Sequence, residues 1–311
     1  MPRPRSAHSL CRSHLAFGLV SAAALASSAV ASPLHVLEKR YTDVGGYANP
    51  TAGGGKWLTL ARNTWPEGLG EPINIVISAN SHPALMTDEG FYDWGMSINF
   101  GTYLLDASGV GSYHGECFGQ TDGARQAANL GDGNGMHNQS DLLRENFGDV
   151  TYGVCKESAN GGFHYRVWRQ NGTDADTGAW FLAASEEEDL SNNHMIVDNG
   201  YDLGRDEVVR RAVAPGGTKS PITNTTYTAT AVNASGVGYF DNITFWDINH
   251  RISTDGVVMV LTVDVTDPGT LAAAARSTGD NAAPGTGASA ADLARAASVG
   301  LFAVFALALL L

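Results

Sequence analysis

The chain has 311 residues, and its 32 acidic side chains outnumber 19 basic ones, which leaves a net charge of −13 at pH 7. This balance argues against nucleic acid or anionic lipid as a partner, because both bind basic surfaces. The length suffices for one sizeable domain with its own core. The sequence contains no His-Glu-x-x-His motif, no calcium-loop spacing and no Gly-x-Ser-x-Gly motif, so it predicts neither a metal nor another cofactor.

The first 40 residues have the features of a secreted precursor. Residues 1–31 combine a basic start, a short apolar run and the small-residue sequence Ala29-Val30-Ala31, which are the parts of a secretory signal peptide. Residues 32–40 end in Lys39-Arg40, which is either the processing site of a propeptide or an ordinary exposed basic pair. Residues 41–71 are expected to be a flexible lead-in, since they are rich in glycine around 45–56.

Hydrophobic periodicity and turn residues place the regular elements between residues 72 and 266. Two helices are expected, the second with Asp202 as its N-cap, and two strands form a hairpin through an Asn-Gly turn. The pattern indicates a single α+β domain with a mixed, largely antiparallel sheet and two main helices. In chain order the expected elements are a strand at 73–79, a helix at 84–98, strands at 163–170 and 178–185, a helix at 202–213, and strands at 226–232 and 257–265.

The predicted hairpin carries the side chains that suggest ligand binding. Alternate side chains of a strand point to opposite faces, so His164, Arg166 and Trp168 share one face while Arg169 faces the other way. The second strand is apolar on both faces, which predicts a central position in the sheet. Arg166, Trp168 and Trp180 are therefore candidate ligand-binding residues. An arginine stacked on a tryptophan as plain surface packing is the alternative.

Residues 186–206 gather seven acidic side chains together with His194 and Arg205. Such residues could bind a metal or exchange protons with a substrate. No second histidine lies at a ligand spacing in this segment. The acidic run at 186–189 is therefore interpreted as a solvated loop, and His194 as a structural histidine.

The C-terminal part of the chain predicts a lipid anchor. Residues 267–295 form a linker or stalk of small residues, with a window at 280–289 suited to attachment of glycosylphosphatidylinositol (GPI). Residues 296–311 are apolar to the chain end, and a helix of that length spans about 24 Å, less than the ~30 Å of a bilayer core. A GPI signal with a removed tail is favoured over a short tail-anchor helix, which predicts a protein on the outer leaflet or at the cell wall.

Cysteines and glycosylation sequons also suit an extracellular protein. Cys11 leaves with the signal peptide, so Cys117 and Cys155 remain as an even pair for a disulfide in an oxidising compartment. Five asparagines begin an Asn-x-Ser/Thr sequon: Asn138, Asn171, Asn224, Asn233 and Asn242.

Several short motifs occur together between residues 72 and 213. They are EPINIVISANS, CFGQ, HYRVWRQNG, WFLAAS and HMIVDNGYDLGRDEVV, and the last of these enters the second expected helix. In order and spacing they resemble the LssY C-terminal-type domain. The matching positions are Phe118, Gly119, Arg166, Trp168, Arg169, Trp180, Ala183, Ala184, His194, Asp202, Arg205 and Asp206.

This resemblance implies a type of domain and a candidate surface but no activity, because none is established for the family. Bacterial members tend to be attached to membrane phosphatase-like proteins, and this chain has no segment of that kind. The cysteine pair and the sequons look like a fungal secreted branch of the family.

Three functional hypotheses result. The first is a GPI-anchored, glycosylated cell-surface protein without an assigned activity. The second is a secreted hydrolase for a phosphoester or carboxylate substrate, with His194, Asp202, Arg205 and Arg166 as catalytic candidates, and it requires these residues to converge. The third is a carbohydrate-binding module, which requires Trp168 and Trp180 to be exposed.

Overall fold

The computed structural model describes residues 41–42, 45–102, 125–234 and 236–271. The predicted signal peptide, the Lys39-Arg40 pair, the GPI attachment window and the apolar tail lie outside the described residues. Among the described residues, no helix is both long and apolar enough to cross a membrane.

An eight-stranded sheet forms the centre of the domain, with the strand order β11-β12-β13-β4-β10-β9-β8-β5. Its neighbouring strands are antiparallel except for β13 and β4, which run parallel. These eight strands are β4 (Ile75–Ile77), β5 (Phe100–Thr102), β8 (Asp141–Glu145), β9 (Gly162–Gly172), β10 (Ala175–Glu187), β11 (Thr218–Lys219), β12 (Thr226–Asn233) and β13 (Met259–Asp267).

Smaller elements lie around this sheet. A three-stranded sheet has the order β3-β6-β7, and β1 pairs with β2. The remaining strands are β1 (Tyr41–Thr42), β2 (Tyr47–Ala48), β3 (Thr59–Leu60), β6 (Ala127–Asn129) and β7 (Met136–Asn138). The α-helices are α2 (Asp88–Ser97), α3 (Gly153–Asn160) and α4 (Gly200–Ala212). Short 3₁₀ helices are η1 (Pro50–Gly53), η2 (Pro83–Met86), η4 (Leu190–Asn192), η5 (Tyr239–Asp241), η6 (Phe245–Asp247) and η7 (Asn249–Arg251).

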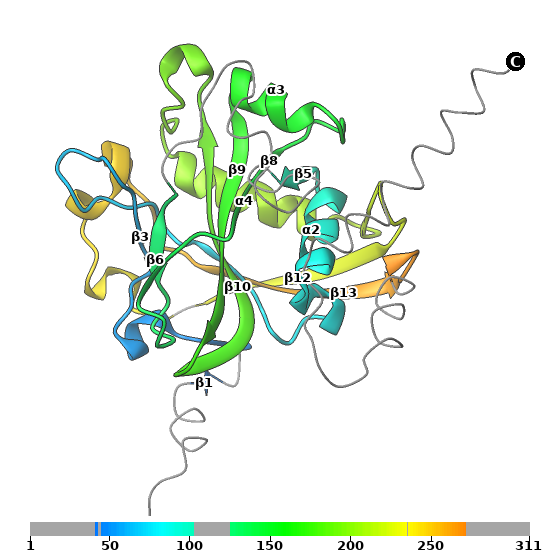
Figure 1. Cartoon of the computed structure of the whole chain (residues 1–311), viewed down its shortest axis with the longest axis horizontal. Coiled ribbons are helices and arrows are strands. Elements are labelled where there is room, and N and C mark those ends of the chain that lie inside the picture. Colours follow the sequence, from blue (N-terminus) through cyan, green and yellow to red (C-terminus); the bar gives the residue numbers. More distant parts are fainter. Residues whose placement is uncertain (1–40, 43–44, 103–124, 235, 272–311) are drawn as a thin grey trace, which may run out of the picture.

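The long hairpin of β9 and β10 divides two hydrophobic clusters. Figure 1 shows β3 and β6 on one side of this hairpin and α2 on the other. Trp168 and Phe181 are cross-strand partners that belong to the cluster with Trp57, whereas Tyr165 and Trp180 belong to the cluster with the residues of α2. The alternation of strand side chains produces this division directly. Each fully buried aromatic side chain stabilises the fold by roughly 1.5–3 kcal/mol.

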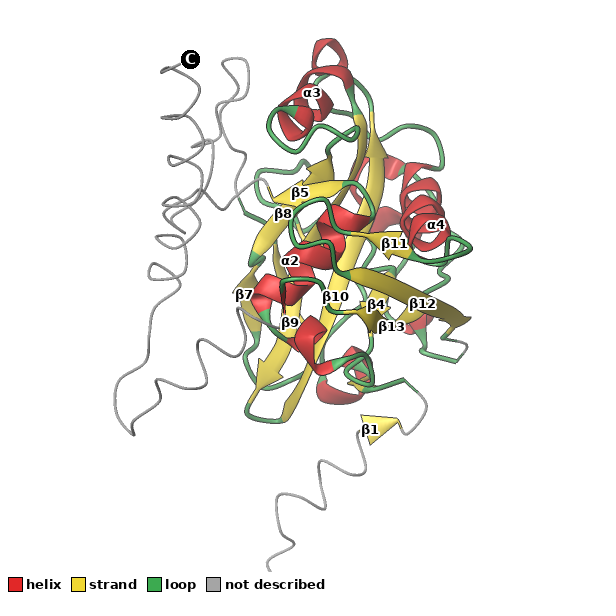
Figure 2. Cartoon of the chain, turned by 90° about the vertical axis from the view of Figure 1, so that its right-hand side faces the viewer, coloured by secondary structure: helices red, strands yellow, loops and turns green. Residues whose placement is uncertain are grey.

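Helix α4 packs closely against β10 at Ser185, just beyond Leu182, where the pairing of β10 with β4 stops. Gly204 allows this approach, because a Cβ atom at that position would lie 2.4 Å from the backbone of Ser185. The side chain of Asn74 joins the three elements: its amide donates to the carbonyls of Ala184 and Tyr201, and its oxygen accepts from the Ala184 N–H. Figure 2 shows α2 and α4 at separate places along the sheet, with α3 near one end.

The predicted fold class is confirmed: the domain is α+β, with a mixed and largely antiparallel sheet. The predicted central position of the second hairpin strand is also confirmed, since β10 lies between β4 and β9. The two predicted helices correspond to α2 and α4, and α3 is a third, shorter helix that was not predicted.

Two local predictions were wrong. The segment expected to be a flexible lead-in packs into the domain, and Trp57 is fully buried there. Its glycines serve close packing, since a Cβ at Gly53 would lie 1.8 Å from the carbonyl oxygen of Gly131. Asp202 is not the N-cap of the second helix; Asn199 holds that position, and Asp202 lies in the first turn.

Candidate functional site

The two tryptophans proposed as carbohydrate platforms are buried. Trp168 is 0% exposed and Trp180 is 1% exposed, and they lie in different hydrophobic clusters. Trp180 stacks on Phe91 with ring centroids 4.4 Å apart, and its indole N–H donates to the carbonyl of Leu85 over 2.7 Å. The requirement of the carbohydrate hypothesis is therefore not met. The arginine that lies over a tryptophan is Arg169, 4.9 Å above the Trp180 ring.

Arg166 is neutralised by a neighbouring carboxylate. Its Nε donates to Glu71 Oε2 over 3.1 Å, and its Nη1 donates to Gln139 Oε1 over 3.2 Å. Glu71 also accepts from the amide of Gln126. Because both partners are mostly buried, the guanidinium is committed to an internal network on this face of the sheet. As predicted, Arg166 and Arg169 lie on opposite faces of β9.

Arg205 and Asp202 of helix α4 bind the segment that precedes β13, at Thr254 and Asp255. The guanidinium of Arg205 donates to both carboxylate oxygens of Asp255, over 2.5 and 3.1 Å. Asp202 accepts from the hydroxyl of Thr254 and from the N–H of Asp255. Burial raises the pKa of Asp202, and this effect outweighs the hydrogen bond from Thr254. These contacts give Asp202 and Arg205 a structural role.

His194 contacts a different carboxylate. Its Nδ1 lies 3.5 Å from Glu187 Oε2, and its side chain is 23% exposed. Arg166 and Arg205 thus form ion pairs with Glu71 and Asp255, whereas His194 contacts Glu187. The convergence that the hydrolase hypothesis requires is not observed.

A different set of polar residues does converge, on the face of the sheet covered by α3. Arg144, His164 and Ser185 are cross-strand partners on β8, β9 and β10, so their side chains form one row across three strands. Glu187 lies two residues beyond Ser185 and shares its face. Glu157 reaches the same place from α3, which ends immediately before β9 begins.

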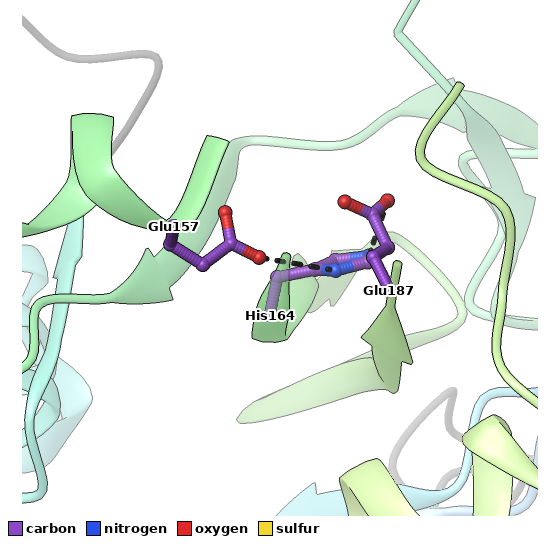
Figure 3. Close-up of side chains that lie close together, drawn as sticks. All are labelled: Glu157, His164 and Glu187. Atoms are coloured by element: carbon purple, nitrogen blue, oxygen red, sulfur yellow. Dashed lines mark ion pairs between the residues drawn. The ribbon is translucent and has the colours of Figure 1, made fainter. Parts of the chain in front are cut away.

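Figure 3 shows the imidazole of His164 between the carboxylates of Glu157 and Glu187. His164 Nδ1 lies 4.0 Å from Glu157 Oε1, and Nε2 lies 3.5 Å from Glu187 Oε1. The hydroxyl of Ser185 lies 3.0 Å from His164 Nε2. The guanidinium of Arg144 donates to Oε2 of Glu157 over 2.5 Å and to Oε2 of Glu187 over 2.9 Å. We call Arg144, Glu157, His164, Ser185 and Glu187 the histidine–glutamate cluster.

Burial dominates the electrostatics of this cluster. It raises the pKa of Glu157 to about 7, against the opposing charge of Arg144. It also lowers the pKa of His164 to about 4, so the imidazole is neutral at pH 7. Burial opposes ionisation of Glu187 as well, but its interactions with His164 and Arg144 hold its pKa well below the usual range. The glutamates outweigh burial at Arg144 and raise its pKa above the ordinary value.

Glu157 Oε1 and His164 Nδ1 face each other, and neither atom has a hydrogen-bond partner within the part of the chain that the structure describes. Leaving a buried polar atom unsatisfied costs about 1–3 kcal/mol. Glu157, His164 and Glu187 each offer a potential metal-ligand atom, and these atoms lie within 4.8 Å of one another.

Little in the sequence pointed to this cluster. Glu187 was assigned to a solvated acidic loop, but it is 8% exposed and belongs to β10. Extending the period-two pattern of β10 by two residues beyond Ser185 would have placed it beside His164. Nothing in the sequence brought Glu157 or Arg144 to the same place.

The residues predicted to carry modifications are only partly described. All five sequon asparagines are exposed. Cys155 lies in α3, and its predicted disulfide partner Cys117 lies outside the described residues, so that disulfide stays a prediction.

No protein-family model matches the chain, and neither a curated protein nor a solved structure matches it. The resemblance to the LssY C-terminal-type domain therefore rests on the sequence motifs alone.

Proposed function

We propose that the protein is an N-glycosylated extracellular protein that a GPI anchor holds at the cell surface, with an LssY C-terminal-like domain as its folded body. The observation that carries this proposal is the exposure of all five sequon asparagines. A glycan is bulky and polar, so an asparagine must be at the surface to carry one without disrupting the core. Asn74 and Asn146, which are buried, lie outside sequons.

The arrangement of the C-terminal part supports the anchor. Strand β13 ends at Asp267, the first residue of the predicted linker, and the last described residues, 268–271, still contact the domain, where the Thr270 N–H donates to the carbonyl of Thr223. The stalk would hold this body away from the outer leaflet or the cell wall. The acidic net charge suits a soluble body that does not adsorb to anionic lipid.

The other two hypotheses receive no such support. Arg166 and Arg205 are bonded to Glu71 and Asp255, so neither is available to bind a phosphoester or carboxylate. Both tryptophans are buried. The proposal therefore assigns a location and a type of domain, and it assigns no catalytic reaction to these residues.

Glycosylation is tested by producing the full chain in a fungal secretory host and treating it with a peptide N-glycosidase. We expect the enzyme to increase the electrophoretic mobility of the protein. Each Asn→Gln substitution at a sequon should remove one glycan and therefore part of this mobility difference. Asn192→Gln is the matched control, because Asn192 is exposed but begins no sequon. A chain whose mobility does not change on treatment would contradict the proposal.

Anchoring is tested on intact cells with a phosphatidylinositol-specific phospholipase. We expect the enzyme to release the protein into the medium, and deletion of residues 296–311 to cause secretion without the enzyme. Retention in the membrane fraction after both treatments would rule out the GPI anchor.

A further inference from the structure

We propose that Glu157, His164 and Glu187 bind a divalent transition-metal ion of the zinc or manganese class. This inference is independent of glycosylation and anchoring. Only His164 of its three residues lies in one of the sequence motifs, because the residues come from α3, β9 and β10.

The first argument is the ligand set. One imidazole nitrogen and two carboxylate oxygens suit zinc and manganese, since imidazole binds zinc well and carboxylates bind manganese well. Ligand atoms at about 2.1 Å from a tetrahedral ion lie about 3.4 Å apart. The ligand atoms of the three residues all lie within 4.8 Å of one another. Closing the site on an ion therefore requires these separations to shorten by at most about 1.4 Å.

The second argument is the pair of unsatisfied atoms. Glu157 Oε1 and His164 Nδ1 are 4.0 Å apart, both side chains are fully buried, and neither atom has a hydrogen-bond partner among the described residues. When the proton of the neutral imidazole is on Nε2, beside the Ser185 hydroxyl, Nδ1 presents its lone pair towards Glu157. Two acceptors then face each other, and a cation between them satisfies both. The 4.0 Å separation needs to shorten by about 0.6 Å to reach the tetrahedral spacing.

The third argument is the orientation of the carboxylates. Arg144 binds Oε2 of Glu157 and Oε2 of Glu187, so the Oε1 atoms remain on the side of the imidazole. Ser185 fixes the ring from its other nitrogen. Outer-shell partners of this kind orient the ligands of metal sites in proteins. Arg144 contributes one positive charge against two carboxylates, so the cluster has a net negative charge when Glu157 is ionised, and a cation can offset that charge.

His194 marks the solvent side of this site. It contacts Glu187 and is partly exposed, whereas Glu157 and His164 are fully buried. An ion that enters from this side passes His194, which contacts Glu187. Asn193 and His194 both have a left-handed backbone where this loop passes Glu187.

The test begins with the full chain purified without chelator. Elemental analysis by mass spectrometry should find close to one zinc or manganese ion per chain. After removal of the ion with a chelator, adding zinc, manganese or cobalt should raise the unfolding temperature, because the ion binds the folded state only. Bound cobalt should also give visible absorption bands that report nitrogen and oxygen ligands. A wild-type chain that holds no stoichiometric ion, and whose unfolding temperature none of the three ions raises, overturns the proposal.

Variants separate this site from accidental binding. Glu157→Gln and His164→Gln should each weaken metal binding at least tenfold. The matched controls are Glu71→Gln, which alters another buried glutamate that pairs with an arginine, and His137→Gln, on β7. An ion that binds equally to all four variants is adventitious and also overturns the proposal. If either site variant fails to fold, the chelation and re-addition experiment on the wild-type chain decides.

Discussion

Arg144 and Glu157 form a buried ion pair in which Nη1 lies 2.5 Å from Oε2, with side-chain exposures of 9% and 0%. Removing two charges from water costs several kcal/mol per ion, and good geometry only partly repays that cost. The pair persists here because the same guanidinium also binds Glu187. The arrangement therefore forms a network in which each member depends on the others.

Arg144→Met should lower the free energy of unfolding by about 3–5 kcal/mol, because it leaves Glu157 and Glu187 buried without their cation. Urea denaturation of the metal-free protein at pH 7 measures the loss. Lys156→Met is the control, since Lys156 pairs with Asp149 at the surface and such pairs contribute about 0–1 kcal/mol. A loss at Arg144 no larger than that at Lys156 would show that the network does not stabilise the fold.

The cluster also predicts opposite pH dependences for two variants. In the folded protein the pKa of Glu157 is raised to about 7, so its contribution to stability is present below pH 4.5 and is lost as pH rises through 7. The pKa of His164 is lowered to about 4, so its contribution is present above pH 6.5 and is lost as pH falls through 4. Between these limits the two contributions oppose each other in the wild-type chain.

Glu157→Gln removes the first contribution, so its stability relative to wild type should rise from pH 4.5 to 7. His164→Gln removes the second, so its relative stability should fall from pH 4 to 6.5. The slope of each difference approaches about 1.4 kcal/mol per pH unit, the value for one proton. Urea denaturation of the chelator-treated, metal-free proteins at a series of pH values measures both slopes. Slopes of the same sign in the two variants would contradict the assigned protonation states.

The sequence predicted features that depend on neighbours along the chain. The two faces of β9 and the central position of β10 follow from period-two alternation, and the structure confirms both. Helices α2 and α4 were recognisable because helical spacing and helix-start residues also depend on neighbours along the chain. The N-cap of α4, however, was assigned to Asp202 when it is Asn199. Boundaries of this kind shift by a few residues because several polar residues compete for the capping position.

The candidate site was not predictable because it depends on contacts between distant segments. Glu157 lies on a helix of eight residues whose N-cap makes no side-chain hydrogen bond, so the sequence contains no start signal from which this helix could be predicted. Glu187 stands among other acidic residues and differs from them only by its burial in β10. The glycine-rich segment before β3 suggested flexibility, whereas Gly53 is there to let two backbone segments touch.

The tryptophans of the hairpin should behave as core residues. Trp168→Ala and Trp180→Ala should each lower the free energy of unfolding by about 3–5 kcal/mol, the usual cost of truncating a buried aromatic residue. Trp246→Ala should cost much less, about 0.5–1 kcal/mol, because Trp246 is 69% exposed and contacts only the guanidinium of Arg251 and the ring of Phe245 among the interactions described for its ring. Thermal or urea unfolding distinguishes these outcomes. If truncation of Trp168 or Trp180 left stability unchanged, the assignment of both residues to the core would be incorrect.

Gly204 offers a substitution whose effect opposes helix propensity. Alanine favours a helix interior over glycine by about 1 kcal/mol, so Gly204→Ala would stabilise an isolated α4. In the folded protein the new Cβ would lie 2.4 Å from the backbone of Ser185, which forces α4 away from β10. Overpacking of this kind costs about 1–3 kcal/mol. We therefore expect a net loss of stability, measured by urea denaturation.

The same displacement should reach the histidine–glutamate cluster, because Ser185 carries the hydroxyl that orients His164. Gly204→Ala should therefore weaken the binding of cobalt in addition to lowering stability. Leu203→Ala, at an exposed neighbouring position of α4, should change neither property appreciably. A Gly204→Ala chain that is more stable than wild type would mean that α4 and β10 are not in the close contact described. Unchanged cobalt binding would show that the position of α4 does not affect the metal site.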